Sequence, residues 1–246
     1  MSWHADQIQG VLFPLQGSKH FDAIDLWKML SGGEMPESYQ KQNGIISGAT
    51  NASGIVGNYS RMINAQVGRI DIFTAPIPSD DDFDLPPHID NFDDALDSHQ
   101  HMFDNILKEA KVTRLALVIN SSILCADAEA SSTTLEALTG IKFPKNSIDN
   151  LFQYNLQKGF ECVPEHRLNR LFTWATATRQ LVSAVIDTFK PQSSTFPTKV
   201  FYVASLKLDI NSATVTDVSE KATGMLSEMV TEAKLVISAH VEGRAK

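Results

Sequence analysis

Two aspartates and a histidine in one short segment have the spacing of a metal site. Asp97, His101 and Asp104 follow one another at intervals of four and three residues, so they share one face if the segment is helical. Imidazole and carboxylate groups together bind zinc and other divalent ions, and a metal-dependent hydrolase or nuclease is therefore one hypothesis. The alternative is an acidic, solvent-exposed helix face. His99 cannot join His101 on one ion, because the two side chains point about 200° apart on a regular helix.

A second cluster is purely acidic. Residues 79–104 contain nine aspartates and neither lysine nor arginine, so the rest of a chain with net charge −8 is close to neutral. Asp80, Asp81, Asp82 and Asp84 lack the spacing and closing glutamate of an EF-hand calcium loop. They suit a docking patch for a basic protein partner or, alternatively, a solvated loop.

Three arginines lie on or beside expected strands. Arg61, Arg69 and Arg114 are candidates for binding an anion, because guanidinium groups hydrogen-bond phosphates and carboxylates in a bidentate manner. Pairing with the many aspartates is the alternative. The glycine-rich segment 44–57 could surround a phosphate, but it lacks the motif of a P-loop or a dinucleotide site. A small anionic ligand such as a nucleotide is therefore a further hypothesis.

The other enzyme signatures are incomplete. Cys162 and His166 are four residues apart, but Pro164 between them breaks helical geometry. Glu232 and Lys234 have the E-x-K form of a metal nuclease but fall in a predicted helix instead of a strand. No Gly-x-Ser-x-Gly or His-Glu-x-x-His sequence is present. We therefore expect a non-enzymatic protein without a cofactor.

The composition is that of a soluble globular protein. The 246 residues are 43% apolar, which suffices for a sizeable core. We find neither a signal peptide nor an apolar run near the ~20 residues of a membrane helix. Two cysteines fit free thiols in a reducing compartment. No basic stripe is present, so the charge does not support a nucleic-acid partner, and we expect a cytoplasmic protein.

Apolar periodicity predicts the elements that must position these residues. Alternating patterns predict strands over 8–15, 59–67, 69–75, 113–120 and 199–210, and threonines favour a strand over a helix at 171–186. Helical spacing predicts helices over 21–30, 93–110, 128–138, 147–157 and 217–240, with 43–57 as a loop. The order indicates an α+β fold, with a mixed or antiparallel sheet, packed helices and a long C-terminal helix. We expect a single domain, 1–246, or two intimate sub-domains, about 1–120 and 121–246.

One stretch carries a family resemblance. From Phe103 a helix leads into a strand that begins Arg114-Leu115 and ends at Asn120; a hairpin containing Val67-Gly68-Arg69-Ile70 precedes it. This order resembles a sporadically distributed family of uncharacterised prokaryotic proteins of about this length. The resemblance implies a bacterial accessory protein of the mobile or defence kind and supplies no activity.

Together these features predict an interaction or regulatory subunit of a larger bacterial assembly. The partner is expected to be a protein. The apolar seam of the C-terminal helix, which includes Met225, Met229 and Val236, offers self-association as an alternative to packing on its own sheet.

Overall fold

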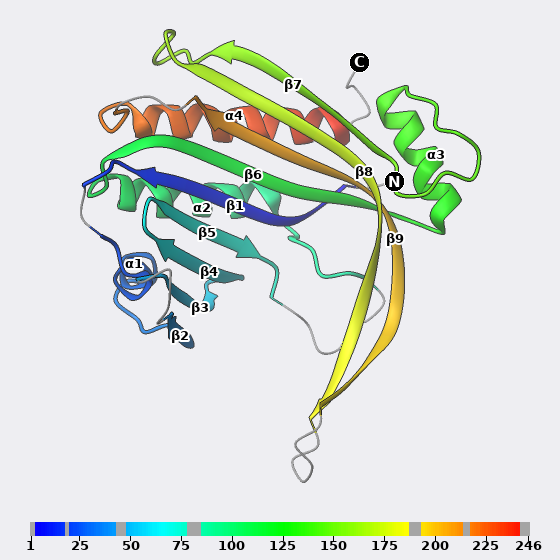
Figure 1. Cartoon of the computed structure of the whole chain (residues 1–246), viewed down its shortest axis with the longest axis horizontal. Coiled ribbons are helices and arrows are strands. Elements are labelled where there is room, and N and C mark those ends of the chain that lie inside the picture. Colours follow the sequence, from blue (N-terminus) through cyan, green and yellow to red (C-terminus); the bar gives the residue numbers. More distant parts are fainter. Residues whose placement is uncertain are drawn as a thin grey trace.

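In the computed structural model, strands from both halves of the chain form one antiparallel sheet (Figure 1). The structure describes residues 3–17, 20–42, 48–77, 85–186, 193–213 and 217–241. Within them the strand order is β2-β3-β4-β5-β1-β6-β9-β8-β7. The elements are β1 (His4–Pro14), α1 (Ala23–Ser31), β2 (Ser38–Lys41), β3 (Thr50–Val56), β4 (Tyr59–Gln66), β5 (Arg69–Ala75), α2 (Phe92–Leu107), β6 (Val112–Cys125), α3 (Ala128–Thr139), β7 (Leu151–Gly159), β8 (Arg167–Ile186), β9 (Ser193–Ser212) and α4 (Ala222–Val241).

The two halves of the chain have the same connectivity. A strand and a helix are followed by three antiparallel strands and a second helix, in β1-α1-β3-β4-β5-α2 and again in β6-α3-β7-β8-β9-α4. In each half the first strand pairs with the last, β1 with β5 and β6 with β9; β2 is an addition to the first half. The halves join where β1 and β6 pair in antiparallel fashion, so a pseudo-twofold axis passes between these two strands.

The helix caps repeat in the same way. Asp22 accepts a hydrogen bond from the backbone N–H of Ile24 at the start of α1, and Asp127 accepts one from Ala130 at the start of α3. Both helices end at a glycine in the left-handed conformation, Gly32 and Gly140. The halves therefore correspond in local detail as well as in topology.

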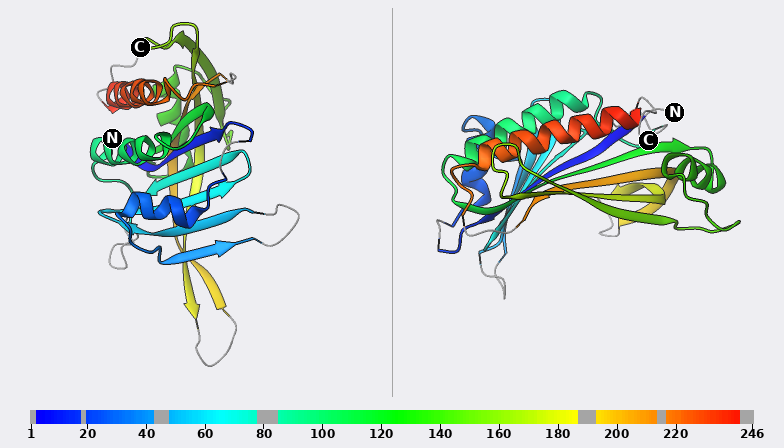
Figure 2. Two further views of the ribbon diagram at one scale, coloured as in Figure 1. Left: turned by 90° about the vertical axis from the view of Figure 1, so that its left-hand side faces the viewer. Right: turned by 90° about the horizontal axis from the view of Figure 1, so that it is seen from above.

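One face of the sheet carries the helices and most of the core. Residues directly opposite one another on neighbouring strands project to the same face. One such row runs through the fully buried residues Ile63, Ile72, Leu117 and Ile210. In Figure 2, α2 and α4 lie side by side over this face. We call it the helix face.

Hydrogen bonds and contacts place all four described helices on the helix face. The α1 backbone N–H of Ala23 bonds Thr50 of β3. On α2, Phe103 lies against Gly10 of β1. Helices α3 and α4 are held by polar contacts to Cys125 of β6 and Arg170 of β8, respectively.

Several predicted elements are confirmed, and two are wrong. The helix predicted over 147–157 is strand β7, in which Phe152 and Tyr154 alternate with Gln153 and Asn155; Tyr154 stacks on Phe172 of β8, with ring centroids 4.8 Å apart. The predicted loop 43–57 contains strand β3, because its small residues allow close packing. A Cβ at Gly54 would lie 3.1 Å from the Trp27 ring.

The C-terminal helix packs on its own chain. Met225, Met229, Ala233 and Val236 form the predicted seam and are buried where α4 contacts β6, β9 and α2. The seam therefore belongs to the core of this chain. Among the described residues, no helix combines the length and apolar character that crossing a membrane requires.

Candidate functional site

The face of the sheet opposite the helices, which we call the open face, is lined with amide side chains. None of the described helices lies on it (Figure 2). Its amides come from eight strands: Gln7, Gln9, Gln40, Asn51, Asn64, Gln66, Asn120, Gln153, Asn155, Gln157, Asn169 and Asn211. Most are exposed or half-buried, so this face offers hydrogen-bonding groups to a ligand.

The amides bond sideways to one another across the strands. Gln157 donates to Asn169 (2.7 Å), Asn169 donates to Asn211 (3.1 Å), and Asn120 of β6 donates to Gln7 of β1 (3.3 Å). Each amide has two N–H donors and a carbonyl oxygen with two acceptor positions. The lateral bonds therefore orient the side chains and leave further donors and acceptors for a ligand.

The open face is basic although the chain is acidic. The net charge of the chain is −8, but the charged side chains described on the strands of the open face are Arg69, Arg114, Arg167, Arg179, Lys199 and Lys207 against Asp6, Asp71 and Asp209. Asp6 is paired with Arg179 (2.6 Å) and Asp71 with Arg69 (2.8 Å). An anion that approaches this face therefore meets an excess of positive charge.

Two of the three arginines predicted to bind an anion meet on the open face. The guanidinium carbons of Arg69 and Arg114 lie 5.8 and 5.1 Å from the ring centroid of Phe13, at the end of β1. A hydrogen bond to Asp71 raises the pKa of Arg69. Arg114 forms no ion pair with a described residue, and its buried Nε has no hydrogen-bond partner among them. Arg114 is therefore the cation of this pair without a carboxylate bound to it in the described part of the chain.

Arg61 lies on the helix face, enclosed between β4 and α2. It is 1% exposed and has no acidic partner in the described part of the chain. It donates to the hydroxyls of Thr74 and Ser98, and Tyr59 lies beside it. Burial lowers the pKa of Arg61 to about 10. The structure thus makes Arg61 a link between the sheet and α2.

His99 is enclosed in the same cluster. Its Nδ1 lies 2.8 Å from the Thr74 hydroxyl, and its Nε2 has no partner among the described residues. Burial first, and the charge of Arg61 second, lower the pKa of His99 from 6.5 to about 3. The ring is therefore neutral at physiological pH.

We expect the protein to lose stability below pH 6.5 because of His99. In the unfolded chain His99 binds a proton near pH 6.5, whereas in the folded protein it binds one only near pH 3. The free energy of unfolding should fall by about 1.4 kcal/mol per pH unit in this range. Urea denaturation at pH 5.5 and 4.5, where the unfolded histidine is almost fully protonated, measures it. His99→Asn, which keeps a donor to Thr74 but does not titrate, should show a smaller loss; equal losses in both proteins would exclude His99 as the cause.

The three predicted metal ligands are not gathered around one point. Asp97 is exposed and binds Lys234 of α4 (2.6 Å), while His101 points into solvent and Asp104 is half-buried. Burial raises the pKa of Asp104. In the parts of the chain that the structure covers, no group of three or more His, Cys, Asp or Glu residues could hold a metal ion. Here Asp97 connects α2 to α4.

Two of the three other predicted sites lie among the described residues. Asp80, Asp81, Asp82 and Asp84 lie outside the described residues. Cys162 is no activated thiol, because burial and the neighbouring carboxylate of Glu228 raise its pKa to about 11. Glu232 of the E-x-K sequence is buried on α4 and binds Lys158 and Arg170.

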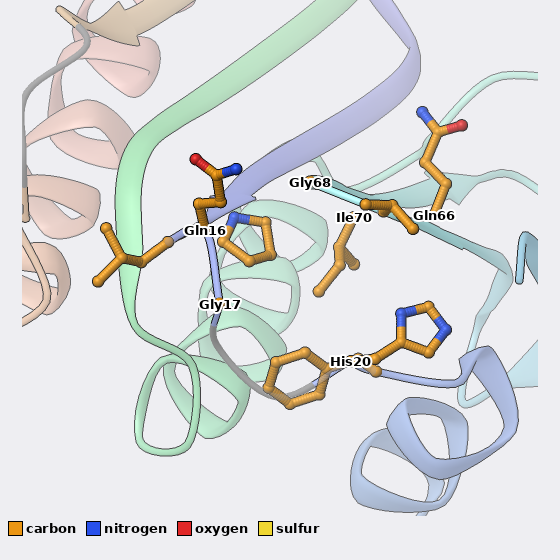
Figure 3. A pocket seen from close by; sticks show the side chains of 10 residues that line it. Gln16, Gly17, His20, Gln66, Gly68 and Ile70 are labelled. Atoms are coloured by element: carbon orange, nitrogen blue, oxygen red, sulfur yellow. The ribbon is translucent and has the colours of Figure 1, made fainter.

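A cavity of about 510 Å³ opens where β1 ends beside the turn between β4 and β5 (Figure 3). Apolar residues such as Phe21 and Ile70 form part of its wall, with Gln16, His20 and Gln66 as polar groups. In Figure 3 the amides of Gln16 and Gln66 lie on opposite sides of the view, and both point toward its top. Among the described lining residues, these two amides therefore do not converge on one ligand atom.

Sequence reasoning missed the open face, although a signal for it exists. Amides recur two residues apart at Gln7 and Gln9 and at Asn64 and Gln66, and this period places them on one side of a strand.

Comparisons of the chain with protein-family models, curated proteins and solved structures found no match. Its function must therefore be inferred from the chemistry of this face.

Proposed function

We propose that the chain is a non-enzymatic binding subunit of a larger assembly and holds its partner on the open face. Antiparallel sheets commonly have one solvated face. What distinguishes the open face is the set of amide and basic side chains that line it. The observation that carries the proposal is the set of amides on eight of the nine described strands, set among arginines and lysines in an acidic chain. Such groups recognise a partner by hydrogen bonds and charge.

The alternatives from the sequence have less support. A metal-dependent hydrolase would need ligands that converge, whereas Asp97 is bound to Lys234 and forms no metal-binding group with His101 and Asp104. A small anionic ligand could use Arg114, but Arg69 is already occupied by Asp71. The resemblance to a prokaryotic accessory family stays a prediction and agrees with a binding role.

Paired charge reversals test where the partner binds. Arg167→Glu with Lys207→Glu changes two exposed residues of the open face, and Lys108→Glu with Lys221→Glu changes two exposed residues beside α2 and α4. Both variants shift the net charge equally. We expect the tagged protein to retain a stoichiometric partner from its own host in the control variant and to lose it in the open-face variant. Equal retention in both variants, or a solitary wild-type protein, would refute the proposal.

A further inference from the structure

We infer that the partner is a single-stranded nucleic acid laid across the open face. The inference rests on the proposed function, since it uses the same surface, and it names the class of molecule bound there. The whole-chain charge argues against nucleic acid, but on the described strands of the open face the cations outnumber the carboxylates. The acidic residues of α2 and α4, such as Asp93, Asp94 and Glu228, lie on the opposite side of the sheet. Salt screens charges over about 8–10 Å, so those carboxylates act weakly at the open face.

The side chains of the open face match the chemistry of an exposed nucleotide strand. Guanidinium and ammonium groups bind phosphates, and Arg114, Arg167 and Lys207 are placed on three different strands for this purpose. Asparagine and glutamine bond the edges of bases, adenine above all. The lateral bonds of Gln157, Asn169 and Asn211 hold their amides in place for such contacts.

Aromatic and guanidinium planes supply stacking. Phe13 and Phe73 are half-buried on the open face of β1 and β5, and Arg114 lies over the Phe13 ring. Unpaired bases stack on aromatic rings and on arginine planes in proteins that bind single strands. Arginine and aromatic residues also occur in protein interfaces, but together with amides that can bond base edges they suit an unpaired nucleotide strand.

The width of the sheet favours a single strand over a duplex. Nine strands spaced ~4.8 Å apart span about 40 Å. Such a sheet is too wide for the grooves of undeformed B-DNA. A sheet occupies the minor groove only when the duplex is bent and opened, which costs deformation energy. An unpaired strand can follow the surface of the sheet and present its base edges to the amides.

Fluorescence anisotropy with labelled 12-nucleotide RNA and DNA of mixed sequence tests the inference. We expect the wild-type protein to bind single strands at 50 mM salt and to lose affinity at least tenfold at 200 mM salt, as about three phosphate contacts require. Arg167→Glu with Lys207→Glu should weaken binding at least tenfold, while Lys108→Glu with Lys221→Glu should stay within twofold.

A second variant separates base recognition from charge. Asn155→Ala with Gln157→Ala removes two exposed amides without altering the net charge. It should weaken binding several-fold and leave the salt dependence unchanged. No binding by the wild-type protein at 50 mM salt would overturn the inference, as would equal binding by both charge variants. Tighter binding of the matched duplex would overturn the assignment to a single strand.

Nuclease treatment distinguishes failure of the inference from failure of the proposed function. If the pull-down partner survives nuclease and is still lost in the open-face variant, the open face binds something other than nucleic acid. The proposed function then stands and the inference falls. If the open-face variant keeps both the oligonucleotide and the partner, neither stands.

Discussion

Replacing Glu232 by alanine should lower the free energy of unfolding by about 3 kcal/mol, within the usual cost of breaking a buried ion pair. Glu232 on α4 is 6% exposed and accepts hydrogen bonds from Lys158 of β7 and Arg170 of β8. Burial opposes its ionisation, but these two cations outweigh burial and keep the pKa of Glu232 below its usual range. Alanine would leave Arg170, which is largely buried, without a counter-charge. Guanidinium denaturation at pH 7 measures the loss.

Two further variants identify the cause. Lys158→Ala should cost less than about 1 kcal/mol, because the Lys158 side chain is well exposed. Glu232→Leu combined with Arg170→Met removes both buried charges and should recover much of the loss. If Glu232→Ala costs no more than Lys158→Ala, the ion pair does not anchor α4 to the sheet.

Gly10→Ala should destabilise the protein by about 3 kcal/mol through overpacking. A Cβ at Gly10 would lie 2.1 Å from two ring carbons of Phe103 and 2.6 Å from Nε2 of His99. Both rings are fully buried on α2, so the helix would have to move off β1. Urea denaturation at pH 7 measures this change.

Gly224→Ala is the matched control. A Cβ at Gly224 in α4 would lie 3.4 Å from the Cys162 sulfur, which is ordinary contact. The substitution should raise stability by about 0.5–1 kcal/mol, because glycine inside a helix is unfavourable. If Gly10→Ala and Gly224→Ala changed the free energy of unfolding by similar amounts, the close approach of α2 to β1 would be contradicted.

Local periodicity predicted much of the fold. The apolar stripe of 93–110 gave α2, whose N-cap is Asn91, with a hydrogen bond from the N–H of Asp94. The prediction of a helix over 147–157 is wrong because Ser147 and Gly159 resemble helix ends. The aromatic and polar residues of β7 alternate with period two, which is typical of a strand. The pairing of β1 with β6 joins residues 98 to 118 positions apart, and no local pattern encodes it.

The candidate site was predicted in part. The sequence predicts Arg69 and Arg114 as candidates for binding an anion, and in the structure both lie beside the Phe13 ring. Arg61 shares its strand face with Ile63 and is therefore turned to the core, which the alternation of β4 already indicated. Predicting the open face would also require the strand order, because side chains from strands of both halves form it.

The duplicated halves have a consequence for direction. Two identical halves would give the open face the same chemistry on both sides of the pseudo-twofold axis. In this chain the first half carries Phe13 and Arg69, and the second half carries the linked amides of Gln157 and Asn169. A symmetric surface cannot tell the 5′ end of a strand from the 3′ end. If the open face binds a single strand, its unlike halves would seat that strand in one polarity only.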